Sequence, residues 1–388
     1  MFTAAPLLHE DETGFGRSDR AASDDGLIAC LPWRAMESEV DAWDALAHRA
    51  SEPNPFFESW YLLPSLRHLG SSECVSILRF ERHGRLAGLL PVVRSRRYYR
   101  WPVPNLAGWL HANAFLGTPL IERGAESAFW RALFDWTDRA PGTALFLHLR
   151  EMPLEGPVHD GLMAARGTRA VETVHREERA VLHSTLSPDD YLEASLTGKK
   201  RKEMRRQWNR LAERGHVTVE RGRNDDGLDN WARQFLALEA AGWKGKAGSA
   251  LASHEGTARL FREALSGAAA RGRLERLALR LDGRPIAMLA TFLTPPGAFS
   301  YKTAFDEGFS RFSPGVLLQR EYLDMLNRRE IAWTDSCAAE DHPMIDHIWR
   351  ERRAVGRLSI AIGGPLRRAL FRRFVKAELA RNPARPRP

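Results

Sequence analysis

Residues 301–318 read YKTAFDEGFSRFSPGVLL, and they are the most informative stretch of the chain for its fold. A strand is predicted over 298–303, and a polar loop follows it. Ser313-Pro314-Gly315 then opens an apolar helix, with Ser313 as its cap and Pro314 in its first turn. Gly315 allows another chain or a ligand to approach closely. Such a helix start either binds a phosphate through its free N–H groups or is an ordinary capped end.

The segments around this stretch predict a hairpin before it and a helix and strand after it. Apolar runs at 274–281 and 285–292 flank Asp282-Gly283, a dipeptide typical of tight turns. A similar hairpin pattern, FERHGRLAG, occurs at 80–88, which weakly indicates a duplication. Helices are predicted over 38–49, 55–69, 126–139, 187–214, 228–242, 257–271 and 314–329. Further strands are predicted over 74–80, 85–94, 144–148, 179–182, 331–335 and 352–362.

Antiparallel hairpins followed by a helix and a strand argue for an α+β fold. The 388 residues suggest two domains at roughly 150 residues each. We expect an acidic disordered tail over 1–26, a first domain over 27–185, a second over 186–363 and a basic tail over 364–388.

Composition excludes several classes of protein. The net charge is 57 − 49 = +8, but residues 364–388 hold eight Lys or Arg and one acid, so the rest is close to neutral. A basic nucleic-acid surface is therefore not predicted. Three cysteines cannot form a disulfide framework or a four-cysteine zinc site. No membrane span or secretory signal is evident, so a cytoplasmic location is expected.

Two polar segments of the second half have a functional and a plain interpretation. The first, at 196–215, reads LTGKKRKEMRRQWNRLAERG. It is either a segment that binds phosphate or RNA, or a solvated helix with Trp208 and Leu211 toward the core. LEAAGWKGKAGSAL at 238–251 places Glu239 and Trp243 on one helix face. Its glycines are typical of a loop that crosses a site, although a helix cap explains the first of them.

The segment WTDSCAAEDHPMIDHIWRER at 333–352 collects ionisable residues after an apolar strand. Asp335 stands at the strand end, where side chains emerge at a sheet edge. Cys337, Glu340, Asp341, His342 and His347 follow, but no pair has a recognised metal-ligand spacing, so no metal is expected. A Cys-His nucleophile pair is no better supported. The chain shows no P-loop, dinucleotide fingerprint, GxSxG or HExxH.

In their order, these segments resemble the GNAT superfamily, specifically the CelD/BioF-like acetyltransferase family related to the FemAB peptidyltransferases. The resemblance covers about 27–362 and is strongest over 187–349. It implies two tandem GNAT-like α+β domains, each a mainly antiparallel sheet flanked by helices, with the acyl-thioester site in the second. It also implies transfer of an acyl group, acetyl first, from coenzyme A to an amine. Such families accompany polysaccharide or envelope biosynthesis, so an amino sugar or another small-molecule or glycan amine is the expected acceptor.

The resemblance also assigns a cofactor loop. In GNAT proteins backbone N–H groups of a glycine loop at a helix start hold the pyrophosphate of acetyl-CoA or another acyl-CoA. The matching residues here are Arg311, Phe312, Ser313, Pro314, Gly315, Val316 and Leu317. The family pattern is Gln/Arg-x-x-Gly-x-Gly/Ala. This chain has one residue too many before its glycine and lacks the second small residue.

The reaction needs a group that accepts a proton from the amine and a group that protonates the leaving thiolate. The candidate bases are Asp335, Glu239 and His342, with Asp335 first for its position at a strand end. Tyr301 and Tyr322 are the candidate acids. Three further residues either face the acceptor or serve packing and surface roles: Trp243, Lys244 and Lys302.

Three functions stay open at this point: an acyl-CoA-dependent N-acyltransferase, an aminoacyl-tRNA-dependent transferase, and a silent binding module. The second predicts RNA contact through 199–214, and nucleic acid is not expected otherwise. The tail over 365–379 is predicted as a basic helix with Leu366, Leu370 and Phe374 on one side. This helix either makes a weak contact with anionic lipid, or it stays solvated or packs on the protein. The second interpretation is favoured, because Arg373 and Lys376 interrupt the apolar side.

Overall fold

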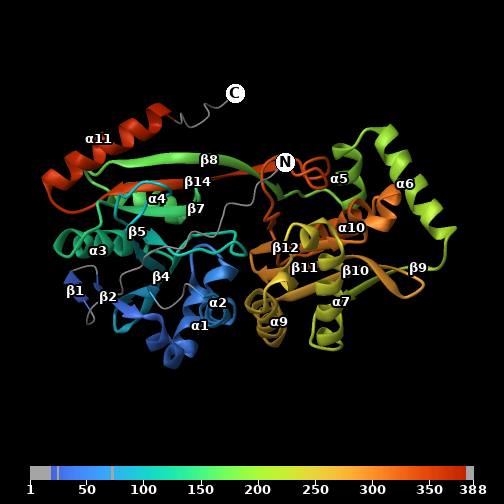
Figure 1. Cartoon of the computed structure of the whole chain (residues 1–388), viewed down its shortest axis with the longest axis horizontal. Helices are drawn as coiled ribbons and strands as arrows, with labels where there is room; N and C mark the ends of the chain where they lie inside the picture. The colour runs from blue at the N-terminus through green and yellow to red at the C-terminus, as the bar shows by residue number, and fades with distance from the viewer. Residues whose placement is uncertain (1–18, 24–25, 71–73, 382–388) are drawn as a thin grey trace. The chain divides into compact units, whose positions relative to one another are not determined.

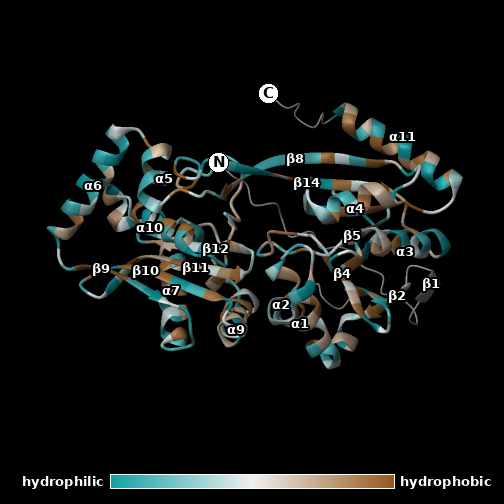
Figure 2. Cartoon of the chain, turned by 180° about the vertical axis from the view of Figure 1, so that it is seen from behind, coloured by the Kyte–Doolittle hydropathy of each residue, from teal (hydrophilic) through white to brown (hydrophobic). Residues whose placement is uncertain are grey.

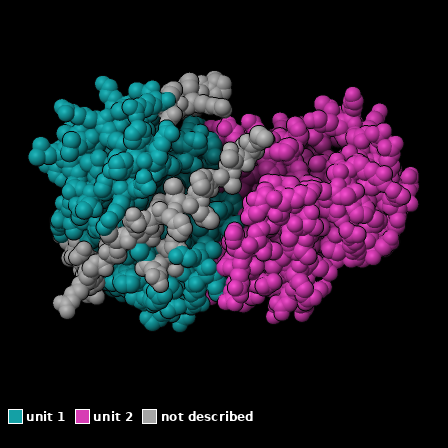
Figure 3. Space-filling view, in the orientation of Figure 1, with its two compact units in different colours: residues 1–177, 354–388 teal, residues 178–353 magenta. Residues whose placement is uncertain are grey.

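The computed structural model describes residues 19–23, 26–70 and 74–381. These residues form two compact units, shown in separate colours in Figure 3. Unit 1 runs up to Glu177 and resumes at Ala354, and unit 2 comprises Glu178–Arg353. The chain passes from unit 1 to unit 2 within one strand and returns within another, so unit 2 is an insertion in the sequence of unit 1.

Unit 1 is a mainly antiparallel sheet with helices. Its strands lie in the order β1-β2-β3-β4-β5-β7-β14-β8, β5 and β7 are parallel, and β6 pairs with β4. The strands are β1 (Asp19–Ser23), β2 (Gly26–Pro32), β3 (Ser76–Arg82), β4 (Arg85–Ser95), β5 (Asn105–Gly108), β6 (Leu120–Ile121), β7 (Phe146–Pro153), β8 (Val171–Leu182) and β14 (Glu351–Ala361). The helices are η1 (Trp33–Glu39), α1 (Val40–Arg49), η2 (Pro55–Phe57), α2 (Ser59–His68), α3 (Glu126–Arg139), α4 (Pro157–Ala165) and α11 (Pro365–Arg381), most of which are labelled in Figure 1.

The ends of unit 1 differ from the expected tails. The predicted disordered segment 1–26 lies partly outside the described residues, but Asp19–Ser23 form β1 and pair with β2. The predicted boundaries at 185/186 and 363/364 are replaced by 177/178, inside β8, and 353/354, inside β14. The reason is non-local pairing, since Val355–Ala361 pair antiparallel with Phe146–Pro153 of β7.

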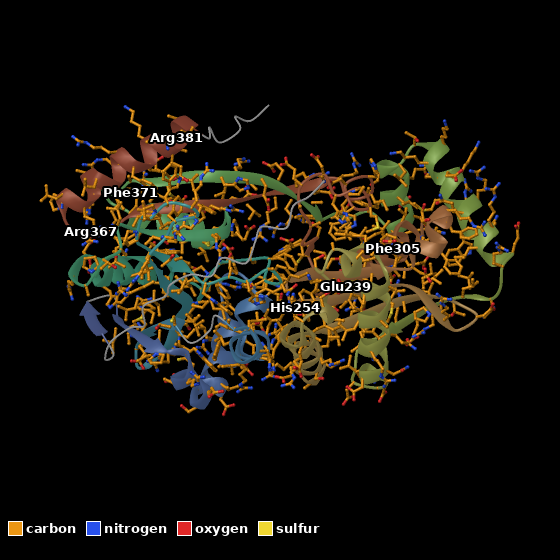
Figure 4. The ribbon with its side chains drawn as sticks, viewed as in Figure 1. Glu239, His254, Phe305, Arg367, Phe371 and Arg381 are labelled. Carbon is orange, nitrogen blue, oxygen red and sulfur yellow. The ribbon has the colours of Figure 1, made fainter. Side chains whose placement is uncertain are left out.

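Helix α11 packs on unit 1 through one face. Phe371, which is labelled on α11 in Figure 4, and Val375 are buried in a cluster with Tyr98 and Phe146. Asp138 fixes the start of the helix, because its carboxylate accepts hydrogen bonds from Arg368, from Arg169 and from the Gly363 N–H. The self-packed interpretation of this tail is therefore the one that the structure shows for 365–381.

The predicted apolar side of this helix is divided between its two faces. Phe374 packs against Tyr98, with ring centroids 5.6 Å apart. Leu366 and Leu370 point outward and are 84% and 58% exposed. The three residues are spaced four apart and lie within about 80° of one another around the helix, so Phe374 stands at the border between this side and the buried face set by Phe371 and Val375.

Unit 2 repeats the same kind of layout. Its sheet has the order β8-β13-β12-β11-β10-β9, antiparallel except for the parallel pair β12 and β13. The strands are the end of β8, β9 (Val217–Gly222), β10 (Leu274–Leu281), β11 (Arg284–Thr294), β12 (Gly297–Phe305) and β13 (Trp333–Asp335). The helices are α5 (Pro188–Ser195), α6 (Gly198–Ala212), α7 (Leu228–Ala241), α8 (Trp243–Lys246), η4 (Leu251–Ser253), α9 (Glu255–Ala270), η5 (Glu307–Phe312), α10 (Pro314–Tyr322) and η6 (Leu323–Asn327).

The hairpin in each unit turns at the predicted dipeptide. His83-Gly84 and Asp282-Gly283 have positive φ at both residues, which suits glycine at the second position and matches the twist of the flanking strands. Each hairpin also has a register shift just before its turn, at Phe80/Glu81 in unit 1 and Leu279/Arg280 in unit 2. In each unit a parallel strand pair follows. These shared details support the duplication that the sequence weakly indicates.

Two layers of helices cover the sheet of unit 2. On one face Phe235 of α7 and Phe261 of α9 stack, and Phe261 reaches Tyr301 of β12. On the other face Leu211 of α6 and Leu317 of α10 belong to one buried cluster with residues of β10 and β11. Apolar residues dominate the inner strands in Figure 2. No helix of the described residues is long and apolar enough to span a bilayer.

Candidate functional site

The site is organised by a bulge in β12. Ala290 of β11 pairs with Lys302 and the next residue, Thr291, pairs with Ser300, so Tyr301 is the extra residue. A bulge places two consecutive side chains on similar sides of a strand. Tyr301 stacks on Phe292 at 4.5 Å between ring centroids, and Lys302 lies near the end of α7.

The bulge coincides with the point at which the two parallel strands part. The pairing of β12 with β13 covers Gly297–Phe299 and Trp333–Asp335, and it ends there. The rest of β12, 300–305, pairs with β11 on one side only within the described residues. This edge of β12 carries Lys302, and backbone groups along it can pair with an extended ligand.

A buried carboxylate at the end of α7 holds the glycine-rich loop beside this edge. Glu239 is 4% exposed and accepts hydrogen bonds at 2.8 Å from Lys244 Nζ and from the Leu251 N–H. Lys244 Nζ also donates to the Thr303 carbonyl at 3.3 Å. The predicted loop over 238–251 is therefore fastened to β12 from inside (Figure 4).

A second carboxylate fastens the same loop from the solvent side. Glu307 accepts a hydrogen bond from the Trp243 N–H at 2.5 Å and pairs with Lys246 at 3.0 Å. The bonds from Lys246 and from the Trp243 N–H hold the pKa of Glu307 below its usual value. Trp243 itself is 56% exposed, so its ring lies away from the buried groups.

Lys302 lies among charged neighbours. Burial, followed by the positive charge of Lys244, lowers the pKa of Lys302 to about 8, while the charge of Glu239 acts in the opposite direction. When the pKa of a lysine lies this close to neutral pH, small changes in its surroundings change its protonation state. Side chains with such perturbed pKa values concentrate at functional sites.

Asp335, the first candidate base, lies deeper than expected. Its carboxylate is 0% exposed, faces the guanidinium groups of Arg179 at 3.8 Å and Arg353 at 3.5 Å, and accepts a hydrogen bond from the Cys337 N–H at 2.8 Å. It thus forms a buried ion pair that fixes the turn after β13. Burial, followed by the charge of Asp335, raises the pKa of the Cys337 thiol well above its usual value, so this cysteine is a poor nucleophile.

His342 lies closer to the charged loop. Burial lowers the pKa of His342. The charge of Asp346 acts in the opposite direction, and the charge of Lys244, which has a smaller effect, lowers the pKa further. Its Nδ1 is buried and has no hydrogen-bond partner among the described residues. A neutral imidazole with a free ring nitrogen can accept a proton. The structure therefore brings together four predicted site residues: Glu239, Lys244, Lys302 and His342.

The predicted phosphate loop begins the helix α10, with two differences from expectation. Ser313 has φ 50° and makes no side-chain cap, so the predicted cap is wrong. Its hydroxyl instead accepts a hydrogen bond from Gln207 of α6 at 3.1 Å. Gly315 does allow a close approach, but a Cβ there would lie 2.5 Å from Met344 Sδ. The side of Gly315 is thus covered by the segment that also carries His342.

The remaining residues of this loop are divided between core and surface. Phe312, Pro314 and Leu317 are buried, Val316 is partly buried, and Arg311 is exposed with its guanidinium 4.6 Å from the centre of the Phe312 ring. Helix α6 contacts both η5 and α10. The exposed cations of α6 therefore belong to a helix that contacts both elements of this loop.

The two candidate acids lie in the packed interior. Tyr301 is 2% exposed between Phe261 and Phe292. Tyr322 is fully buried, stacks on Trp349, and its oxygen accepts a hydrogen bond from Thr291 at 3.1 Å. Burial raises the pKa of Tyr322.

Three residues that contact the two loops of the site were not predicted from the sequence. Gln207, Glu307 and Met344 carry no motif signal, because each is defined by a partner distant in sequence. No group of three or more His, Cys, Asp or Glu in the described ranges could hold a metal ion.

Residues 198–343 match a family model described as an acetyltransferase (GNAT) domain. The search of curated proteins returned no match. Solved structures that align with TM-scores above 0.5 include the following three. FemX is 11% identical, with 85% of this chain and 98% of FemX covered and a TM-score of 0.51.

The C-terminal domain (DUF2156) of a putative lysylphosphatidylglycerol synthetase from Agrobacterium fabrum is 12% identical, with 88% and 96% covered and a TM-score of 0.51. A conserved protein of unknown function from Bacteroides thetaiotaomicron VPI-5482 is 13% identical, with 83% and 97% covered and a TM-score of 0.53. At these identities the likeness concerns the fold alone. The predicted fold class, an α+β chain of two units with mainly antiparallel sheets flanked by helices, is confirmed, and the GNAT model matches within the second unit.

Proposed function

Because residues 198–343 match the model of a GNAT acetyltransferase domain, we propose that this protein is an N-acyltransferase that moves an acyl group from coenzyme A to an amine. One observation carries the proposal. The bulged, half-paired edge of β12 holds Lys302 beside Lys244, Glu239 and His342, in the half of the chain that the family model matches. A thioester carbonyl at this edge would meet cations and a neutral imidazole.

The residues divide the chemistry as follows. His342 accepts a proton from the acceptor ammonium, because its lowered pKa keeps it neutral near pH 7. The amine then attacks the thioester carbon and the carbon–sulfur bond breaks. The leaving thiolate takes the proton from the imidazolium, and the other amine proton passes to water. Lys302 stabilises the negative charge that forms on the carbonyl oxygen. Glu239 positions Lys244 and the loop. Asp335 is a positioning residue, since its buried ion pair keeps it from the acceptor.

The donor is an acyl-CoA, with acetyl-CoA as the first candidate. Its pyrophosphate would meet Arg311 and the cations of α6, because Met344 covers Gly315 and leaves no bare glycine cradle on that side. The acceptor is an amine, and an amino sugar of a glycan precursor fits the expected class.

The test is thermal stability and turnover with a panel of free CoA, acetyl-CoA, longer acyl-CoAs and charged tRNA. A donor at ~100 times its dissociation constant stabilises by about 2.7 kcal/mol, a shift of several degrees. We expect a shift with one acyl-CoA and release of its thiol when an amino sugar is added. If none of the thioesters shifts the unfolding temperature, the proposal is overturned. If no ligand of the panel shifts it and no turnover occurs, a binding module is favoured.

The basic helix α6 supports a second candidate, transfer from an aminoacyl-tRNA. Two of its cations pair with acids, Arg201 with Glu193 and Arg206 with Glu203. The exposed cations Lys199, Lys200, Lys202, Arg205, Arg210 and the following Arg214 face solvent. A stability shift with charged tRNA that disappears at higher salt would move this candidate to first place.

The proposed roles predict a bell-shaped dependence of kcat/KM on pH. Lys302 must be protonated, so the rate should fall as pH rises through about 8. His342 must be neutral, so the rate should fall only at acidic pH, below its lowered pKa. In Lys302→Arg the alkaline limb should move far upward, because a guanidinium stays charged. Both enzymes are assayed with the same acceptor, so the ionisation of the acceptor affects the two profiles equally. If the alkaline limb does not move in Lys302→Arg, Lys302 is not the group that causes it.

A further inference from the structure

We propose that the outer face of α11, with the neighbouring turn at 96–101, docks on an anionic lipid bilayer. Six large hydrophobic side chains are exposed among the described residues, and four of them belong to this part of unit 1. They are Leu366 (84% exposed), Leu370 (58%), Trp101 (44%) and Tyr99 (40%). We call these four residues and the exposed cations around them the basic apolar face.

The turn at 96–101 is held against α11 by specific contacts. Tyr98 donates a hydrogen bond to Glu378 of α11 at 2.6 Å, and its ring packs on Phe374. The Arg381 guanidinium lies 5.4 Å from the centre of the Trp101 ring. The turn and the helix are therefore parts of one surface of unit 1.

The outward direction of the leucines follows from the buried side of the helix. Phe371 and Val375 point inward, and Arg367 donates to the carbonyls of Ala144 and Gly142. At 100° per residue Leu366 and Leu370 fall on the far side of the helix. Their exposure is thus fixed by the packing of α11 and does not result from a loosely placed helix.

The exposed charges of this face have one sign. The cations are Arg96, Arg97 and Arg100 on the turn and Arg372, Arg373, Lys376 and Arg381 on α11. Glu378, the one acid of α11, is bonded inward to Tyr98, and 94–104 contains no acid. Seven exposed cations therefore lie on the two segments that carry four of the exposed apolar side chains.

A bilayer satisfies both properties together. Each Lys or Arg close to an anionic surface contributes about 1 kcal/mol, and exposed leucine and tryptophan enter the boundary between headgroups and acyl chains. An RNA would use the cations but would leave Leu366 and Leu370 in water. The face is consequently better matched to lipid than to nucleic acid.

The experiment is cosedimentation of the full chain with vesicles of phosphatidylcholine, with and without phosphatidylglycerol. We expect pelleting with the anionic vesicles alone, and weaker pelleting as salt rises. Arg372, Arg373 and Lys376 changed together to Ser should weaken the partition roughly a hundredfold. Leu366→Ser with Leu370→Ser should weaken it roughly tenfold.

Matched variants distinguish binding through this face from a general effect of positive charge or of exposed hydrophobic side chains. Lys202, Arg205 and Arg210 changed to Ser remove three exposed cations from α6, and Leu186→Ser removes an exposed leucine (41%) from unit 2. Neither should alter pelleting. All changed side chains are exposed, so unchanged thermal unfolding checks that each variant is folded.

Several results would overturn the proposal. Equal pelleting with neutral vesicles, an α6 variant as weak as the α11 variant, or leucine variants that pellet like the parent chain each contradict it. A gel-shift with tRNA that depends on the α11 cations, without vesicle binding, would assign this face to RNA instead.

Discussion

Lys302→Met should lower kcat/KM for acyl transfer about 100- to 1,000-fold while the protein stays folded. The side chain lies on the bulged edge of β12, where the proposed function places the thioester carbonyl. Removing a donor aimed at a developing oxyanion loses stabilisation that exists only in the transition state. KM for the acyl donor should change little, which distinguishes this effect from lost binding.

The comparison needs a conservative variant and a control. Lys302→Arg keeps the charge on a longer, planar group and should retain part of the rate. Arg233→Met removes an exposed cation from the solvent side of α7 and should leave kcat/KM unchanged. If Lys302→Met loses less than about fivefold, the oxyanion is stabilised elsewhere and the assignment is wrong.

Glu239→Ala should lower the free energy of unfolding by about 3 kcal/mol and abolish most activity. The change removes a buried acceptor and leaves two donors, Lys244 Nζ and the Leu251 N–H, without it. The Lys244 side chain is about a quarter exposed and can reorient toward water. The expected loss in the free energy of unfolding therefore lies at the low end of the range for a broken buried ion pair. Urea unfolding monitored by tryptophan fluorescence measures it.

The same loop supplies the control. Glu307→Ala removes the acceptor on the solvent side, which serves Trp243 and Lys246. Because these groups can bond to water, stability should change far less than in Glu239→Ala. Glu239→Gln, which can still accept from the Leu251 N–H, should fall between the two. Equal losses for the two alanine variants would show that the inner carboxylate has no special role.

Local pattern was enough to predict most elements of unit 2. The hairpin around Asp282-Gly283 has its first strand at Leu274–Leu281, as predicted, because an alternating pattern and a turn dipeptide are local signals. Pro314 at the first position of α10 is likewise a local preference. Pairing between β14 and β7 involves segments about 200 residues apart, so no local signal announces it.

The sequence offered candidate residues for the site but not their arrangement. Glu239, Lys244, Lys302 and His342 were named as candidates for the reaction that the family resemblance implies, and their arrangement depends on the bulge at Tyr301 and on the loop after α7. Asp335 ranked first because a strand-end carboxylate is usually accessible. The two arginines that bury it, Arg179 and Arg353, come from other strands.

The insertion of unit 2 within unit 1 reverses the usual order of folding during synthesis. Residues 178–353 are contiguous, so they can fold as soon as they have left the ribosome. Unit 1 begins earlier but lacks the strand between β7 and β8 until residues 354–361 emerge. Until then β7 exposes an unpaired edge, which is a template for aggregation. The part of the protein that is made first is thus completed last.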